Sequence, residues 1–327
     1  MRTLNPLQTL TIAAAITILA GCAAGGTSAI TQETAPQNGA MLHPVSFDSC
    51  PATGPIEYVS DAHNSVIYIY KGPFAGQAPC GQITSGLRTP YELYVQATTH
   101  DLYVANYGGS DVAVFHRGHM RPYNNYKDPT GQQTADVAIA SDGTVIAINV
   151  SQKNGQEDGS LSTWIAGPGG GTFVGNFQLT SNNAAGASVA VDGSGTVYFD
   201  DFRCTVKCGE LWTVKCPAGV CGTQTQVAGV AFNAAGGMAF DSSGDLLITD
   251  AGSPGAGQIF ELPNPNPTTF SLGDAPFGMA ISQRYHHWFV AYSTNHEAAK
   301  YSYPSGTVVG SVPCCPSGVA IGIAFDP

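Results

Sequence analysis

The stretch Gly237-Met-Ala-Phe-Asp241-Ser-Ser-Gly244-Asp-Leu-Leu-Ile-Thr-Asp250 decides the fold that we predict for this chain. It consists of two short apolar runs joined by a polar turn that contains a glycine, a pattern typical of a β-hairpin. Similar pairs of runs recur along the chain, and the clearest copies start at Glu92, Asp136, Ser188 and Gly278. The chain is therefore expected to repeat one hairpin unit many times.

The copies have the period of propeller blades. The position that ends the second run of each copy is occupied by Asp61, Asn106, Asn149, Asp201, Asp250 and Tyr292, at spacings of 42 to 52 residues. Repeats of about 40 to 50 residues are typical of four-stranded blades. A third apolar run and a weaker fourth run follow each copy, so the sequence predicts six four-stranded antiparallel blades.

Two partial repeats at the ends of this region complete one blade. The run Ile56–Asp61 lacks a first strand before it, and Gly322–Asp326 is a first strand without the rest of a blade. We predict that the C-terminal strand joins the N-terminal blade, which closes the ring and leaves no open edge between the first and last blades. The predicted fold class is an all-β, six-bladed β-propeller over residues 56–327.

The composition agrees with many short strands. The 327 residues include 40 Gly and 21 Pro, which interrupt the chain too often for a helix-rich architecture. The net charge is −11, and it becomes −12 without Arg2 in the expected leader. Nucleic acids and anionic membrane surfaces bind basic patches, so this acidic balance argues against both as direct partners.

The N-terminus has the features of a secretion signal. Arg2 precedes the apolar run Leu10–Leu19, which is too short to span a bilayer. The following Leu19-Ala20-Gly21-Cys22 resembles the lipobox of bacterial lipoproteins, in which the cysteine is lipidated and becomes the first mature residue. The alternative is an ordinary signal peptide with a cysteine there by chance.

The lipobox resemblance implies three segments. Residues 1–21 are the expected signal peptide, residues 22–55 are the lipidated Cys22 and a flexible tether, and residues 56–327 are the propeller. No aspartate follows Cys22, which favours the outer membrane of a bacterial cell envelope over the inner membrane. Which side of that membrane carries the propeller is left open.

The repeats resemble the NHL and YVTN-type repeats of β-propeller proteins. The resemblance rests on segments such as Leu102-Tyr-Val-Ala-Asn106 and Gly322-Ile-Ala-Phe-Asp326, and it extends over about residues 56–327. It implies the fold but no single function, because such propellers include enzymes, adaptors and carriers.

Eight cysteines follow Cys22, and an even number in an oxidising compartment predicts disulfides. In the propeller frame, Cys204 and Cys208 flank one end of the fourth blade and Cys216 and Cys221 flank the other end, roughly 20 Å away. We therefore predict the pairs Cys204–Cys208 and Cys216–Cys221. A zinc site is the alternative, but these spacings depart from common zinc patterns.

The remaining four cysteines leave more than one pairing open. Cys50 and Cys80 fall near the same end of the first blade, which predicts a disulfide that ties the tether to the closing blade. Cys314 and Cys315 are expected either to form a strained disulfide with each other or to contribute one partner to Cys50.

The candidate binding site lies where the first strand of each blade opens. These positions hold Glu92, Asp136, Ser188, Gly237, Gly278 and Gly322, so two adjacent blades carry a carboxylate where others carry a small residue. Two like charges at one mouth of the channel favour a bound cation or a raised pKa. Tyr91 and Phe277 precede equivalent positions and would supply a stacking wall. The alternative is that Glu92 and Asp136 are simply solvated.

The Asp and Asn residues at the ends of the second strands also have two interpretations. As a ring that includes Asn106, they would hold a cation or a polar ligand at the channel mouth. Alternatively, each Asx side chain bonds nearby backbone N–H groups and stabilises a turn, which is the interpretation that the sequence favours.

Two functions follow from these observations. The favoured one is a non-enzymatic, monomeric, envelope-tethered module that binds a small molecule, a glycan or an envelope protein at the channel mouth, without a cofactor. The second rests on a resemblance to six-bladed regucalcin and gluconolactonase propellers. It implies a lactonase-like hydrolase with Ca²⁺ or another divalent cation on Glu92 and Asp136. No asparagine opens a first strand, however, and three of the six openings are glycine. A resemblance to streptogramin lyases is weaker still.

Overall fold

The computed structural model describes residues 50–327 except 52, 73–77, 151, 154–155, 158, 180–185, 202–208, 233–234, 252–254, 261–266, 274, 283, 295 and 316–317. These residues belong to one compact unit, residues 44–327. The predicted signal peptide, Cys22 and most of the predicted tether lie outside the described residues, and so do Cys204 and Cys208.

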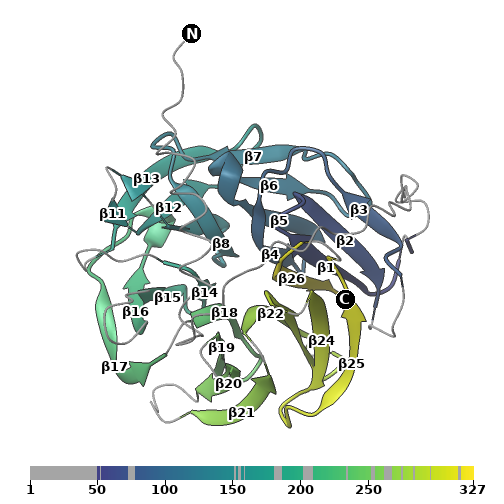
Figure 1. The fold of residues 1–327 in the computed structure, drawn as a ribbon. Helices are drawn as coiled ribbons and strands as arrows, with labels where there is room; N and C mark the ends of the chain where they lie inside the picture. The colour runs from purple at the N-terminus through teal and green to yellow at the C-terminus, as the bar shows by residue number, and fades with distance from the viewer. Residues whose placement is uncertain are drawn as a thin grey trace. The chain divides into compact units, whose positions relative to one another are not determined.

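The described residues form six four-stranded antiparallel sheets arranged as the blades of a propeller (Figure 1), as predicted. The innermost strands are β4 (Pro90–Gln96), β8 (Gln133–Ile139), β14 (Val189–Val191), β18 (Ala235–Phe240), β22 (Pro276–Ser282) and β26 (Ala320–Asp326). Each packs against the inner strands of the two neighbouring blades, so the six surround one central axis.

The outer strands of each blade follow in chain order. The second strands are β1 (Ile56–Asp61), β5 (Asp101–Asn106), β9 (Thr144–Val150), β15 (Thr196–Asp201), β19 (Leu246–Asp250) and β23 (His287–Tyr292). The third strands are β2 (Val66–Lys71), β6 (Asp111–Phe115), β12 (Ser160–Ile165), β16 (Glu210–Lys215), β20 (Gly255–Phe260) and β24 (Glu297–Ser302). The outermost strands are β3 (Gly81–Ile83), β7 (Asn124–Lys127), β13 (Thr172–Gln178), β17 (Thr225–Ala231), β21 (Thr268–Gly273) and β25 (Val308–Pro313).

Minor elements complete the described part of the chain. A short hairpin pairs β10 (Gln152–Lys153) with β11 (Gln156–Glu157), and two single-turn 3₁₀ helices are η2 (Tyr107–Gly109) and η3 (Pro217–Gly219). Within the described residues, no helix has the length and apolar character needed to cross a membrane.

The first two strands of a blade are joined by the turn that the sequence predicts. Between β18 and β19, the Asp241 side chain accepts hydrogen bonds from the backbone N–H groups of Ser243 (2.8 Å) and Asp245 (2.9 Å). Gly244 follows at a φ of +88°, where a residue with a Cβ is strained. Asp192 and Gly195 repeat this arrangement between β14 and β15. The Asx side chain and the glycine together set these two hairpins.

The C-terminal strand closes the ring as predicted. β26 pairs antiparallel with β1, with Ile56 opposite Asp326 and Asp61 opposite Ala320. Asp326 is fully buried, and its carboxylate also forms an ion pair with Arg117 (2.6 Å). The closing strand is therefore linked both to the first blade and to the loop that follows β6.

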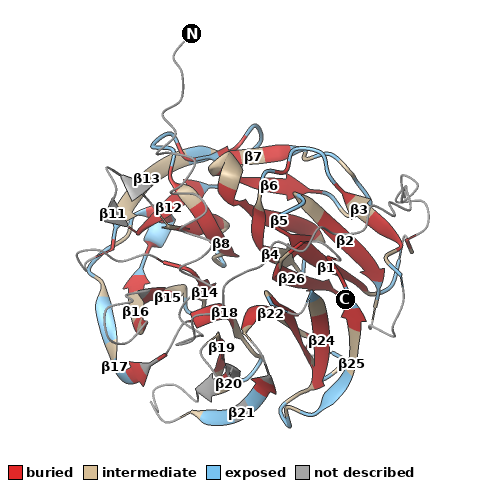
Figure 2. Cartoon of the chain, in the orientation of Figure 1, coloured by how far each residue is buried: buried red, intermediate tan, exposed pale blue. Residues whose placement is uncertain are grey.

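The core consists mainly of layers between adjacent blades, and buried residues occur in the strands of every blade (Figure 2). Each inner strand carries an apolar residue that is followed by alanine in every blade except the second, where Tyr94 follows Leu93. In at least three blades the apolar residue packs in one cluster with the alanine of the preceding blade. Leu93 shares a cluster with Ala324, Met238 with Ala190, and Met279 packs against Ala239. This alternation matches large side chains to small ones across each interface and keeps the blades in register.

The inner strands depart from regular pairing near their N-terminal ends. Register shifts occur at Pro90/Leu93, Thr134/Asp136, Ala235/Met238 and Pro276/Met279. Side chains of the second strands satisfy backbone groups there. Ser60 Oγ accepts from Gly322 N and donates to Tyr91 O (both 2.7 Å), and Thr249 Oγ1 accepts from Gly237 N (2.7 Å) and donates to Phe277 O (2.6 Å). These hydroxyl groups link adjacent blades at the level of the candidate site.

Two predicted disulfides are confirmed. Cys50 bonds to Cys80 and ties the segment before β1 to β3, and Cys216 bonds to Cys221 around η3. The disulfide expected for Cys314 or Cys315 is wrong, because both residues are free thiols in the structure. Cys50 is already paired, and a bond between neighbouring residues would need a strained ring. The two thiols instead hydrogen-bond to each other, and Cys315 Sγ lies 3.9 Å from the Ser60 carbonyl oxygen.

Both thiols should resist alkylation in the folded protein. Cys314 and Cys315 are buried, and the hydrogen bond with Cys314 together with burial raises the pKa of the Cys315 thiol, so little thiolate is present to react. We expect iodoacetamide to leave both unmodified in the native state and to modify both in denaturant, as measured by peptide mass spectrometry. A non-reducing peptide map that joins Cys314 to Cys315 or to Cys50 would contradict this assignment.

Candidate functional site

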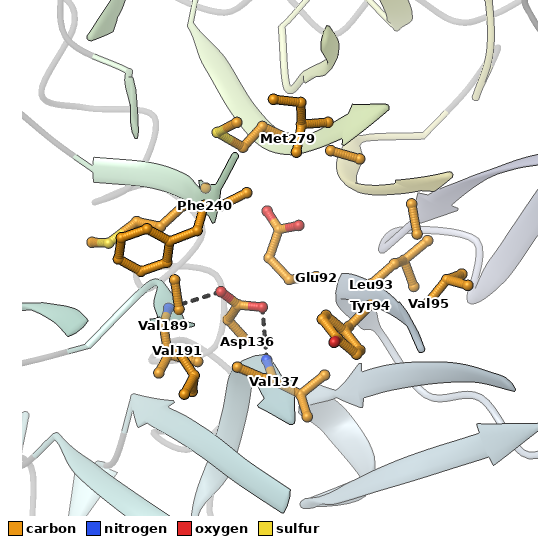
Figure 3. Close-up of a pocket in the computed structure, with 18 of the residues that line it drawn as sticks. Glu92, Leu93, Tyr94, Val95, Asp136, Val137, Val189, Val191, Phe240 and Met279 are labelled. Atoms are coloured by element: carbon orange, nitrogen blue, oxygen red, sulfur yellow. Dashed lines mark hydrogen bonds between the residues drawn. The ribbon is translucent and has the colours of Figure 1, made fainter. Parts of the chain in front are cut away.

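A cavity of about 250 Å³ lies on the propeller axis between the inner strands. All six inner strands contribute to its lining, and both candidate carboxylates, Glu92 from β4 and Asp136 from β8, are part of it (Figure 3). The structure therefore brings together the two residues by which blades two and three depart from the repeat.

The cavity widens towards the C-terminal ends of the inner strands. In β4, the residues up to Leu93 are buried, whereas Tyr94 to Gln96 are partly exposed, and β18 and β22 also become partly exposed in their C-terminal halves. Glu92 and Asp136 are only 3% and 6% exposed. Where the sequence analysis expected an exposed mouth at the strand openings, the structure places both carboxylates at the deep end of the cavity.

Close approach of the inner strands explains this depth. A Cβ on Gly322 would overlap the Tyr91 carbonyl oxygen, and a Cβ on Gly278 would overlap the Ile321 carbonyl oxygen. A Cβ on Gly237 would lie only 2.7 Å from Met279 N. The glycines at the strand openings thus allow neighbouring backbones to converge.

Glu92 reaches towards the far side of the channel. A Cβ added to Gly278 of β22 would lie only 2.7 Å from Glu92 Oε1, so the carboxylate lies against this glycine. The carboxylate accepts hydrogen bonds from the backbone N–H groups of Leu93 and Ile323, but Oε1 has no hydrogen-bond partner among the described residues. Burial and the nearby Asp136 carboxylate raise the pKa of Glu92 well above its ordinary value, against the lowering effect of the two N–H groups.

Asp136 is held more tightly. Its Oδ1 accepts a hydrogen bond from Val137 N (2.7 Å), and its Oδ2 accepts from Val189 N (2.8 Å) and from the Ser188 hydroxyl (3.3 Å) in the next blade. Burial raises the pKa of Asp136 to about 7, although these three donors favour the ionised form. The pair of carboxyl groups can therefore change its charge near neutral pH.

Tyr94 is a cavity residue that the sequence analysis missed. It lies two residues after Glu92 and lines the cavity beside it (Figure 3). The other five blades carry Ala138, Ala190, Ala239, Ala280 and Ala324 at this position. Comparing each position across the copies, and not only the strand openings, would have identified Tyr94 as a second departure within blade two.

The other predicted site residues lie outside the lining. Tyr91 is buried and stacks on Tyr107, with ring centroids 4.6 Å apart, and Phe277 is also buried. Asn106 accepts a hydrogen bond from Arg88 N (2.6 Å) and donates to Asp111 Oδ1 (2.7 Å). Asn106 thus has the turn-stabilising contacts that the second interpretation of the Asx residues described.

The lining offers few groups for a metal ion. Apart from Glu92 and Asp136, it consists of Tyr94 and residues without a polar side-chain group. Calcium usually takes about six to eight oxygen ligands. Among the described residues, no group of three or more His, Cys, Asp or Glu side chains is arranged to hold a metal ion. The donor set of this cavity therefore fits a hard divalent cation poorly.

A second hollow of about 510 Å³ lies at the outer edge of the second and third blades. It is bordered by β7 and by the turn between β12 and β13, and Tyr123 on its border is 47% exposed. Neither Glu92, Tyr94 nor Asp136 lines this outer hollow. A substitution at Tyr123 therefore provides a control for substitutions in the central cavity.

Comparison with known proteins supports the fold alone. No sequence family and no curated protein matches the chain. Among solved structures, a chain of the nidogen–laminin complex is similar with a TM-score of 0.64 and 10% identity over 84% of this chain and 99% of that one. A protein of unknown function from Bacteroides caccae has a TM-score of 0.59 and 12% identity over the same shares. A catalytically inactive virginiamycin B lyase from Staphylococcus aureus, solved with quinupristin, has a TM-score of 0.50 and 12% identity over 68% of this chain and 69% of that one. The chain thus has the fold of a six-bladed β-propeller.

Proposed function

We propose that the protein is a binding module of the bacterial cell envelope that holds a small molecule in its central cavity. The observation that carries the proposal is that Glu92, a residue of the cavity lining, has a buried Oε1 without a hydrogen-bond partner among the described residues. A buried hydrogen-bond acceptor without a partner destabilises the protein by about 1 to 3 kcal/mol, and a ligand that donates a hydrogen bond to it would recover that free energy.

Binding is preferred to catalysis because the lining offers no reactive side chain beyond its two carboxyl groups and the Tyr94 hydroxyl. Neither a histidine, a lysine, a serine nor a cysteine is among the residues that line the cavity. A lactonase-like reaction would depend on a divalent cation at Glu92 and Asp136, and the lining supplies too few oxygen ligands to favour it. Calcium titration with a readout of melting temperature distinguishes the two functions.

The proposal is tested with benzyl alcohol as a small neutral probe. Val191 lines the half-buried part of the cavity, so Val191→Trp should fill the space that the probe needs. We expect saturation-transfer NMR to detect benzyl alcohol on the wild type and on Tyr123→Ala, because Tyr123 borders the outer hollow and is not part of the central cavity. The signal should be lost with Val191→Trp. Binding that persists in Val191→Trp, or no binding to the wild type, would refute the central cavity as a small-molecule site.

The envelope location rests on the resemblance of residues 19–22 to a lipobox. If Cys22 carries the lipid, Cys22→Ser should move the protein from the membrane fraction to the soluble fraction in a bacterial host, because the propeller would lose its acyl anchor. Fractionation with and without a signal-peptidase inhibitor measures this. Unchanged membrane association of Cys22→Ser would contradict lipid anchoring at this residue.

A further inference from the structure

Resting on the function proposed above, we infer that the ligand of the central cavity is a small organic ammonium ion. Its charged nitrogen would lie at the deep end of the cavity against Glu92 and Asp136. Its apolar part would extend along the strands towards the open end. The distribution of polar and apolar groups along the cavity supports this ligand class.

The deep end supplies hydrogen-bond acceptors without a protein cation to occupy them. The Glu92 carboxylate extends into the space between the inner strands (Figure 3), and its Oε1 is buried without a partner among the described residues. The residues that line the cavity include no Lys, Arg or His. An ammonium nitrogen has up to three N–H donors and is attracted by carboxylates. It therefore suits both the unpaired Glu92 Oε1 and the negative charge of the two carboxyl groups.

The rest of the lining suits an apolar body. Phe240 and Met279 border the cavity opposite the carboxylates, and Tyr94 adds an aromatic ring beside Glu92 (Figure 3). Aromatic faces attract cations, and methionine side chains adapt to the shape of an apolar ligand. A volume of about 250 Å³ lies below the range of about 300 to 1,000 Å³ that is typical of sites for drug-sized ligands, so the ligand is small.

Other ligand classes fit this distribution less well. A sugar needs several amide, hydroxyl or charged partners, but the lining includes no Asn, Gln, Ser or Thr side chain. An anion would meet two carboxyl groups with no compensating cation among the residues that line the cavity. A hard metal ion would meet mostly aliphatic walls. The combination of an acidic end with apolar walls therefore favours an amine.

Binding of an ammonium ion should be coupled to proton release. The ionisable side chains that line the cavity are Glu92 and Tyr94 of β4 and Asp136 of β8, whereas β14, β18, β22 and β26 add none. The nearby Asp326 of β26 is already paired with Arg117 and His100. Because burial raises the pKa of both cavity carboxyl groups, an arriving cation should displace a proton from them at pH 6 to 7.

The test compares benzylammonium with benzyl alcohol, a neutral probe of nearly the same shape. Isothermal titration calorimetry on the full-length protein at pH 8 should show benzylammonium binding about tenfold or more tightly than benzyl alcohol. Glu92→Gln has the same shape as the wild-type residue and should abolish this preference while changing the benzyl alcohol affinity by less than about threefold. Tyr123→Ala should change neither affinity.

A second measurement needs no variant. Titrations of the wild type at pH 6.5, in buffers with different ionisation enthalpies, should reveal the release of protons on benzylammonium binding and none with benzyl alcohol. The benzylammonium affinity should fall as the pH is lowered from 8 to 6, since protons then compete for the carboxylates.

The possible results separate the two proposals. If both probes bind with equal affinity and Val191→Trp blocks both, the small-molecule site stands and the ammonium inference is overturned. If neither probe binds, or if Val191→Trp leaves binding unchanged, the proposed function itself fails. A preference for benzylammonium that survives Glu92→Gln would also overturn the assignment of the charged nitrogen to Glu92.

Discussion

Gly278→Ala is expected to destabilise the protein by about 3 kcal/mol, because inner strands β22 and β26 converge at this residue. The added Cβ would overlap the Ile321 carbonyl oxygen and would lie 2.7 Å from both Gly322 Cα and Glu92 Oε1. Two of these neighbours are backbone atoms, which can retreat only if the blades move apart. The loss should be measured as the free energy of unfolding in chemical denaturant.

Gly193→Ala provides the matched control for this substitution. A Cβ on Gly193 meets no atom within 4 Å, and its backbone is not in the left-handed region. We expect a change within about 0.5 kcal/mol of the wild type. If Gly278→Ala were as stable as Gly193→Ala, the convergence of inner strands that places Glu92 at the deep end of the cavity would be contradicted.

The stability of the wild type should fall as the pH rises from about 4 to about 8. The pKa of Asp136 is raised from 3.8 to about 7, so between these values the native state holds a proton that the unfolded state has released. The free energy of unfolding therefore falls as the pH increases. At roughly 1.4 kcal/mol per pKa unit, Asp136 alone lowers it by up to about 4 kcal/mol. The raised pKa of Glu92 adds to this fall in the same direction.

Glu92→Gln should reduce this pH dependence. The amide keeps an oxygen for the N–H groups of Leu93 and Ile323 and removes one of the two buried acids. We expect the variant to match the wild type near pH 4 and to be more stable than the wild type at pH 8, as measured by denaturant unfolding at both pH values. Asp142→Asn should leave the fall intact, because Asp142 is exposed and hydrogen bonding from Thr144 lowers the pKa of this residue. A wild type whose stability is equal at pH 4 and pH 8 would rule out buried, protonated carboxyl groups in the cavity.

The fold could be predicted because its signals are local and repeated. The hairpin of Gly237 to Asp250 has its turn residues in the sequence, and the split repeat between Ile56 and Asp326 predicts the closing strand that the structure shows. The Cys50–Cys80 disulfide followed from the same frame. Contacts that depend on how blades pack were harder to foresee. The free thiols of Cys314 and Cys315 are an example, because pairing depends on local geometry that the repeat pattern does not contain.

The candidate site could be predicted only in part. Glu92 and Asp136 were identified because they replace small residues at a repeated position, and the structure places both in one cavity. Their depth was not foreseen, because it depends on how closely Gly278 and Gly322 allow neighbouring backbones to approach. Tyr91 and Phe277 were chosen for sequence proximity, but successive residues of a strand point to opposite sides, and both side chains are buried outside the cavity lining. Residues two positions apart in a strand point to the same side, so Tyr94 is the aromatic residue expected on the same side as Glu92.

The most direct test of the binding site is a crystal structure of the protein soaked with 4-bromobenzylammonium, using the anomalous signal of bromine. We expect one bromine peak in the central cavity towards the C-terminal ends of the inner strands, with the ammonium nitrogen within hydrogen-bond distance of Glu92. A bromine peak in the outer hollow beside Tyr123 with none in the central cavity, or a nitrogen turned away from Glu92, would contradict it.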